Sequence, residues 1–240
     1  MRDVLIIPFN GEESIVIASD NSGAIGSRDM DVVHVPYETV AYYCFRVAVM
    51  ECMAAGAQPF AITVQNFCGE YAWSLLLNGI KQGIDELGLE GIQINGSTES
   101  NFTLVQSALG ITVLGKKNNG FLLDPLLYSE KTKLAVIGAP LVGDEVVEKA
   151  AEITPLALFK CLCNMKGAVL LPVGSKGILA EINRLFSNQS FDGTEIMTNV
   201  DIHKSSGPST CFIAVFPLAM EREIKMVAGQ YFHGIEVIKC

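Results

Sequence analysis

Several acidic and amide side chains in this sequence stand at the ends of apolar segments, where they could bind a ligand. Asp20 and Asn21 follow the apolar run Ser14–Ala18, and Glu51 lies inside an apolar segment with helical spacing. A carboxylate surrounded by apolar side chains is costly to bury, so we expect Glu51 either to reach solvent or to meet a cation. Magnesium takes oxygen ligands and keeps waters and substrate phosphates in its shell, so converging carboxylates would suit it. A second polar group follows a later apolar strand and comprises Ser97, Thr98, Glu99 and Asn101.

The common phosphate-binding and catalytic motifs are absent from the sequence. It contains no G-x-x-x-x-G-K-[ST], no G-x-G-x-x-G between a strand and a helix, no G-x-S-x-G elbow and no kinase catalytic-loop pattern. A nucleotide would therefore have to be bound through acidic side chains and magnesium rather than through a lysine-bearing phosphate loop.

The composition limits the class of partner. The 240 residues are 50% hydrophobic and 18% charged, which allows one large or two small domains with a substantial core. A net charge of -9 argues against nucleic acid or an anionic membrane as the main partner. No apolar run reaches the roughly 18 residues needed to span a bilayer, and MRDVLIIPFN offers no signal-peptide cleavage pattern. We therefore expect a cytoplasmic protein.

The pattern of apolar residues predicts an α+β fold in two domains. The first half is predicted to contain a strand over 14–18, a helix from Pro36 to Gly56, a strand over 60–66, a helix over 71–87 and strands over 92–95 and 107–114. The polar run 116–120 is the predicted linker. The domains would then comprise residues 1–116 and 121–240. The second half is predicted to contain strands over 133–138, 168–172 and 211–216 and helices from Glu145, over 156–165 and over 177–186.

Residues 14–115 resemble the N-terminal ATP-binding domain of the superfamily that includes aminoimidazole ribonucleotide synthetase, thiamine-monophosphate kinase, selenophosphate synthetase and a hydrogenase-maturation dehydratase. The pattern of that domain is a strand ending in aspartate, a helix ending D-x-A-A-M-G-A-x-P, and a G-G-D-T turn before a strand ending in glycine. The corresponding segments here are IVIASDNSG, AVMECMAAGAQP and INGSTESNF...GITVLG. The resemblance continues more weakly to the end of the chain.

The resemblance implies that residues 1–116 form an ATP-binding and dimerisation domain and residues 121–240 a C-terminal α/β domain that closes over substrate. ATP and magnesium are the implied cofactors, and a homodimer is the implied assembly. Asp3, Asp20 and Glu51 are the implied metal ligands, with Glu51 in place of the helix aspartate. The implied nucleotide contacts are Asp20, Asn21, Ser97, Thr98, Glu99, Asn101 and Lys176. Ser97 replaces the aspartate of G-G-D-T, and either Glu99 or a water held by Ser97 could substitute for it.

The second half departs from the kinase branch of the superfamily at its acceptor segments. Val173 and Lys176 take the places of two aspartates in the D-I-S-D-G-L-x-A-D-L segment, and SSGP at 205–208 stands where that branch has an acidic G-G-E-D turn. The loss of these carboxylates argues against thiamine monophosphate as the substrate. A lysine at position 176 could face a phosphate or a developing negative charge.

The leading hypothesis is an ATP-dependent small-molecule kinase acting on a nucleoside. The phrases ASDNSG, VAVMECMAAG and GSTESN are similar to α-ribazole kinases, which implies α-ribazole as the acceptor and a role in salvage of the lower ligand of cobamides. One alternative is an ATP-dependent ligase or cyclase of the same fold, and another is a non-catalytic ATP-binding regulator. The sequence assigns no catalytic residue.

Simpler interpretations of the same residues remain open at this point. Asp20 could close an Asx-turn, Glu51 could extend to the surface, and Ser97-Thr98-Glu99 could begin a helix. Arg28 and Asp29 in the polar loop SRDMD are expected to be solvated, with phosphate as an alternative partner for Arg28.

Overall fold

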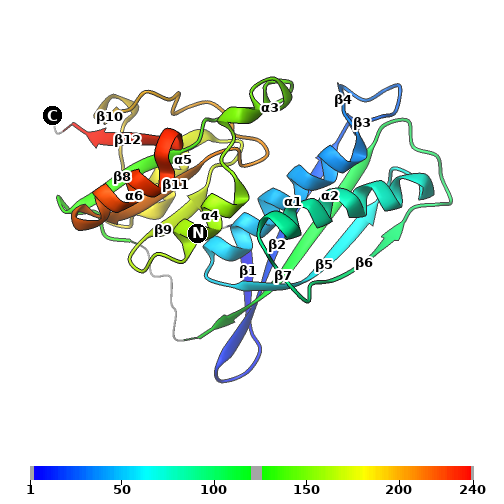
Figure 1. Ribbon diagram of the computed structural model, residues 1–240, viewed down its shortest axis with the longest axis horizontal. Coiled ribbons are helices and arrows are strands. Elements are labelled where there is room, and N and C mark those ends of the chain that lie inside the picture. The colour runs from blue at the N-terminus through cyan, green and yellow to red at the C-terminus, as the bar shows by residue number, and fades with distance from the viewer. Residues whose placement is uncertain (1–2, 120–125, 239–240) are drawn as a thin grey trace. The chain divides into compact units, whose positions relative to one another are not determined.

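The computed structural model describes residues 3–119 and 126–238, which form two compact units, one on each side of the gap. Each unit contains one five-stranded sheet with helices packed on it (Figure 1). No helix within these described ranges is long and apolar enough to cross a membrane.

The first unit is built on a sheet with the strand order β1-β2-β7-β5-β6. Its strands are β1 (Val4–Pro8), β2 (Glu13–Gly23), β5 (Gln58–Asn66), β6 (Gln93–Thr98) and β7 (Ala108–Asn118). Neighbouring strands are antiparallel except for β5 and β6, which are parallel and are joined through a helix. A short parallel pair, β3 (Ile25–Gly26) and β4 (Val33–His34), lies in the connection that follows β2.

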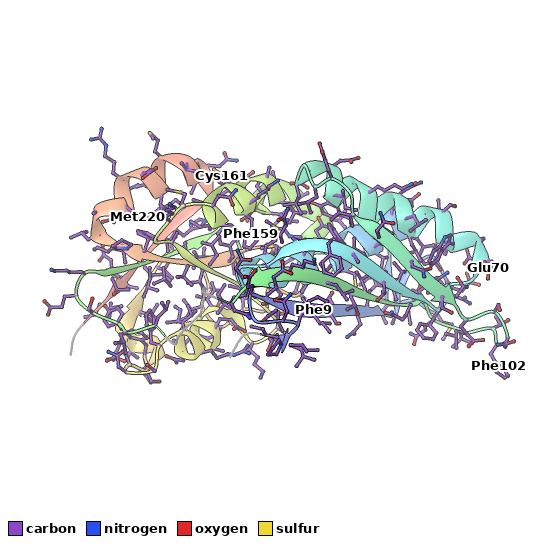
Figure 2. The ribbon with its side chains drawn as sticks, turned by 90° about the horizontal axis from the view of Figure 1, so that it is seen from below. Phe9, Glu70, Phe102, Phe159, Cys161 and Met220 are labelled. Carbon is purple, nitrogen blue, oxygen red and sulfur yellow. The ribbon has the colours of Figure 1, made fainter. Side chains whose placement is uncertain are left out.

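Two helices pack on one face of this sheet, α1 (Tyr37–Ala54) and α2 (Trp73–Glu86), the second preceded by a 3-10 turn, η1 (Glu70–Ala72). Figure 1 shows them side by side over the strands. Alternate residues of β2 point to this face, so Ser14, Val16 and Ala18 are buried whereas their neighbours are not. We call the opposite face the open face, because no helix within residues 3–119 covers it (Figure 2).

The structure corrects three predicted strand ends in the first unit. β2 does not stop before Asp20 but continues to Gly23, β6 includes Gly96–Thr98, and β7 includes residues 116–118 of the predicted linker. The cause is pairing: β2 and β7 form an unbroken antiparallel ladder from Glu13 opposite Asn118 to Gly23 opposite Ala108. Backbone hydrogen bonding along such a ladder outweighs the weak strand propensity of Asp, Asn and Gly.

The second unit has an antiparallel sheet with the strand order β10-β12-β8-β11-β9. Its strands are β8 (Thr132–Ile137), β9 (Val169–Pro172), β10 (Ile196–Met197), β11 (Phe212–Pro217) and β12 (Phe232–Val237), and its helices are α3 (Glu145–Glu148), α4 (Leu156–Cys163), α5 (Gly177–Leu185) and α6 (Glu221–Ala228). The helices occupy both faces, with α5 on one and α4 with α6 on the other (Figure 2). The sheet therefore contributes apolar side chains to two cores, and sequence analysis missed β10, β12 and α6.

Candidate functional site

Three connections of the first unit meet at one end of its sheet, which we call the loop end. They are residues 24–36 after β2, residues 67–72 after β5 and residues 99–107 between β6 and β7. The strand register brings them together, because Ser22, Leu109, Asn66 and Thr98 lie in one row across the four strands. The loop end therefore gathers most of the predicted nucleotide contacts.

The register also places individual predicted residues relative to one another. Asn21 and Ser97 lie in the same row, with Gly110 and Gln65 on the two strands between them. Strands are about 4.8 Å apart, so these two residues are about 14 Å from each other across the open face. Asp20 and Thr98 belong to the neighbouring rows, and their side chains point to the face that the helices cover.

Asp20 is a half-buried carboxylate inside β2. Burial raises its pKa to about 6, although hydrogen bonds from the Cys44 thiol of α1 and from the backbone N–H of Asn21 act in the opposite direction. Since Asp20 lies in a strand, the Asx-turn interpretation is wrong. Burial makes the charged form of this carboxylate unfavourable, and a bound cation would offset that free-energy cost.

The other two predicted metal ligands lie in different positions. Glu51 is half-buried in α1, seven residues beyond Cys44 and hence about 10 Å further along the helix axis. Asp3 is exposed just before β1, level with the Ser19–Asp20 part of β2. Across the described ranges, no group of three or more His, Cys, Asp or Glu side chains is arranged to hold a metal ion. Magnesium bound here would therefore need phosphate oxygens and waters to complete its shell.

The segment 97–102 forms the end of β6 and a tight turn rather than the start of a helix. The Thr98 hydroxyl accepts a hydrogen bond of 3.1 Å from Asn66 Nδ2, which also donates to the Gly69 carbonyl at 2.9 Å. Glu99 Oε1 accepts from the backbone N–H groups of Asn101 at 2.7 Å and Phe102 at 3.3 Å. Glu99 thus closes the turn, while Ser97 and Asn101 are exposed.

Buried polar contacts that sequence analysis missed tie the three connections together. The Asp31 carboxylate accepts hydrogen bonds from the Ser107 hydroxyl and N–H, both at 2.7 Å, and from the Arg28 N–H at 2.9 Å. The Arg28 guanidinium donates to the carbonyls of Leu104 and Cys68, which belong to the other two connections. The expectation of a solvated Arg28 is therefore wrong, and its partners are backbone carbonyls.

Asp31→Asn is expected to destabilise the first unit by about 1–3 kcal/mol, because an amide leaves part of this buried hydrogen bonding unsatisfied. Burial raises the pKa of Asp31, but the hydrogen bonds from Ser107 and Arg28 outweigh it and lower the pKa below 3.8. This contribution to stability is present above pH 3.8 and is lost as the pH falls through the lower value. Urea unfolding at pH 7 measures the effect, followed by the fluorescence of Trp73, the single tryptophan, which lies in the first unit.

Asp29→Asn is the matched control, because Asp29 is an exposed carboxylate in the same connection. It should change the free energy of unfolding by less than about 0.5 kcal/mol. Equal stability of the two variants would contradict a structural role for Asp31.

Lys176 lies in the second unit, directly before α5, and is exposed. The two acceptor segments that depart from the kinase branch are in contact just before α5, because the Ser206 N–H donates a hydrogen bond of 3.1 Å to the Gly174 carbonyl. Val173 is completely buried, so this position cannot contact a substrate. Lys204, beside Ser206 in sequence, forms an ion pair of 2.7 Å with Glu145.

Comparison with known proteins identifies the fold. No protein-family model and no curated protein matches the sequence. Among solved structures, PurL of T. maritima complexed with ADP has a TM-score of 0.63 and 13% identity, over all of this chain and 42% of PurL. HypE in a HypE–HypF complex has a TM-score of 0.65 and 11% identity, over all of this chain and 88% of HypE. HypE of E. coli, a hydrogenase maturation protein, has a TM-score of 0.59 and 10% identity, over 93% of this chain and 80% of HypE.

PurL and HypE are members of the superfamily that the sequence resembles. The chain therefore has the aminoimidazole ribonucleotide synthetase-like fold, and that prediction is confirmed. It spans less than half the length of PurL but most of the length of HypE. At these levels of identity the likeness shows the fold, and the kinase activity stays a prediction.

Proposed function

We propose that this chain is an ATP- and magnesium-dependent kinase that phosphorylates a small-molecule acceptor. The observation that supports this most directly is Asp20, a half-buried carboxylate in the last part of β2 with a pKa raised to about 6. The likeness in fold between this chain and PurL, which has been solved in complexes with ADP and with ATP, supports ATP as the ligand.

In this proposal, Asp20 would hold magnesium, which would neutralise part of the charge of the phosphates. Asp3 and Glu51 are the further metal-binding candidates. Asn21, Ser97, Thr98, Glu99 and Asn101 are the nucleotide-binding candidates of the first unit, and Lys176 is the candidate in the second unit. Phosphoryl transfer is in line from ATP to a hydroxyl of the acceptor, and most of the rate comes from positioning and charge stabilisation.

The proposed acceptor is a nucleoside, with α-ribazole as the first candidate because of the segments ASDNSG and GSTESN. This would place the enzyme in salvage of the lower ligand of cobamides. The exposed Lys176 replaces an aspartate that the acceptor segment has in the thiamine-monophosphate kinase branch, which favours an acceptor without a positive charge.

We also propose that the working form is a homodimer built on the open face. Apolar side chains gather on the half of this face away from the loop end, where Leu5 and Ile7 of β1 pair with Ile17 and Ile15 of β2. Leu5 is 58% exposed and Ile7 is 43% exposed. A second copy of the sheet would bury this surface and gain hydrophobic free energy.

Transfer of labelled phosphate from ATP to a panel of nucleosides, including α-ribazole, tests the function. We expect a phosphorylated nucleoside and ADP only when magnesium and the correct acceptor are both present, with no transfer in excess EDTA. ADP formation without acceptor phosphorylation, on addition of a carboxylate or amide substrate, would support a ligase or cyclase instead.

A non-catalytic regulator is the second candidate, favoured by the completely buried Val173 in place of an acceptor aspartate. It would bind magnesium-ATP in equilibrium dialysis yet produce no ADP with any acceptor in the panel. ATP affinity that is unchanged by EDTA would contradict a metal-dependent nucleotide site, both for the kinase and for the regulator.

A further inference from the structure

A chain of hydroxyl groups leads from the surface of the loop end to the buried Asp31 carboxylate. Tyr71 Oη lies 3.3 Å from Tyr37 Oη, which lies 2.9 Å from Ser107 Oγ, and Ser107 Oγ lies 2.7 Å from Asp31 Oδ2. Tyr37 and Ser107 are each 1% exposed, whereas Tyr71 is 64% exposed. The chain therefore connects one buried charge to one accessible hydroxyl.

The carboxylate fixes the direction of every hydrogen bond in this chain. An ionised Asp31 can only accept, and its lowered pKa keeps it ionised at neutral pH. Ser107 must then donate to Asp31, so Tyr37 donates to Ser107 and Tyr71 donates to Tyr37, since each hydroxyl has one proton. The raised pKa of Tyr71, caused first by its hydrogen bond with Tyr37, agrees with this direction. Tyr71 Oη is left with lone pairs toward solvent and no proton to offer.

Tyr71 is linked to the candidate nucleotide contacts through one buried amide. Asn66, which is 1% exposed, donates through Nδ2 both to the Thr98 hydroxyl and to the Gly69 carbonyl, two residues before Tyr71. Two exposed aromatic rings belong to the connections at the same end, Phe67 after β5 and Phe102 after β6. Figure 2 shows Phe102 and Glu70, the neighbour of Tyr71, at the same extremity. Flat apolar rings at the same end of the sheet as a fixed hydrogen-bond acceptor suit a base attached to a sugar that carries hydroxyl groups.

We propose that Tyr71 Oη accepts a hydrogen bond from a ribose hydroxyl, either of the nucleotide or of a nucleoside acceptor, an inference that rests on the proposed function. Because the Tyr71 proton is committed to Tyr37, the site selects a ligand group that can donate and discriminates against a deoxyribose at that position. Tyr71 is thus a specificity-determining contact, and Tyr37 orients it.

Isothermal titration calorimetry with excess magnesium tests the contact in two arms. One arm uses ATP, 2′-deoxy-ATP and 3′-deoxy-ATP, and the other uses α-ribazole and its 2′-deoxy and 3′-deoxy analogues. In one arm, the wild-type chain should bind the ribose ligand about 5-fold more tightly than the analogue that lacks the contacted hydroxyl. A difference in affinity of about 5-fold corresponds to the loss of one neutral hydrogen bond. Tyr71→Phe should bind both forms with the affinity of the deoxy analogue. The arm in which the discrimination occurs identifies the source of the ribose.

Two further variants make the result specific. Tyr37→Phe, with its fold checked by thermal melting, should reduce the discrimination less than Tyr71→Phe does, because Tyr71 loses its orienting partner but a ribose hydroxyl can still accept its proton. Tyr231→Phe in the second unit should behave as the wild type.

The outcomes separate the Tyr71 contact from the proposed function. Discrimination that survives in Tyr71→Phe would overturn the inference while leaving ATP binding and the kinase proposal intact. Absence of discrimination in both wild-type arms would do the same. Failure of the wild-type chain to bind either ATP or α-ribazole would overturn the proposed function together with this contact.

Discussion

Asp20→Asn should reduce magnesium-ATP affinity or phosphate transfer by at least about 10-fold to 100-fold, the range seen when groups that support a metal are lost. The variant keeps the side-chain shape and a carbonyl oxygen for the Cys44 thiol, but it removes the charge that a cation would meet. Wild-type affinity should also rise between pH 5 and 7, as Asp20 loses its proton near pH 6. That rise should be smaller in the variant, in which only the terminal phosphate of ATP still titrates in this range. Titration calorimetry with magnesium-ATP measures both effects.

The same substitution should stabilise the first unit at pH 8 by about 2 kcal/mol, allowing for the partial exposure of Asp20. The folded pKa of about 6 lies above the ordinary value of 3.8, so folding favours the protonated form. The stability from this group is fully present below pH 3.8 and is lost as the pH rises through about 6. At pH 4 the variant and the wild type should therefore unfold at nearly the same urea concentration.

Asp85→Asn is the matched control, because Asp85 is an exposed carboxylate on α2. It should change neither affinity nor stability. Asp20→Asn with unchanged affinity would remove Asp20 from the site, whereas a loss of stability at pH 8 would contradict the cost assigned to its charge.

Gly79→Ala should destabilise the first unit by about 1–3 kcal/mol, although the same change in an exposed helix interior stabilises by about 1 kcal/mol. The missing Cβ of Gly79 on α2 would lie 2.1 Å from the Glu38 carbonyl oxygen at the start of α1. Backbone cannot move aside as a flexible side chain can, so the two helices would have to separate. Urea unfolding followed by Trp73 fluorescence measures the change.

Gly11→Ala provides the comparison, since the Cβ position of Gly11 meets no atom within 4 Å. Its effect should stay within about 0.5 kcal/mol. A stabilised Gly79→Ala variant would show that α1 and α2 do not approach each other as closely as the structure indicates.

Most elements of the fold could be predicted because apolar residues recur with the period of the element that they form. The periodicity places α1, α2, β5 and the core strands of the second unit correctly. It fails where pairing rather than composition decides the strand, as at Asp20 in β2. It also fails for α6 and β12, since EREIKMVA and FHGIEV are short segments in which polar residues or glycine interrupt the apolar ones.

Only those residues of the candidate site that belong to short sequence motifs could be predicted. The resemblance to the superfamily motifs points to Asn21 and Ser97, and the strand register puts them in one row. The Asp31–Ser107 contact joins residues 76 positions apart, and neither has a local pattern that distinguishes it from an ordinary loop residue. Only the folded backbone brings such groups together, so this part had no signal in one sequence.

The ladder between β2 and β7 has a consequence for the order in which the chain can fold. It is a central pairing of the first sheet, yet it joins Glu13–Gly23 to Ala108–Asn118, with both helices and β5 and β6 between them in sequence. Pairings between distant segments form slowly because a long loop must close first. On the ribosome, the sheet of the first unit can therefore be completed only after β7 has emerged, while α1 and α2 can already pack against each other.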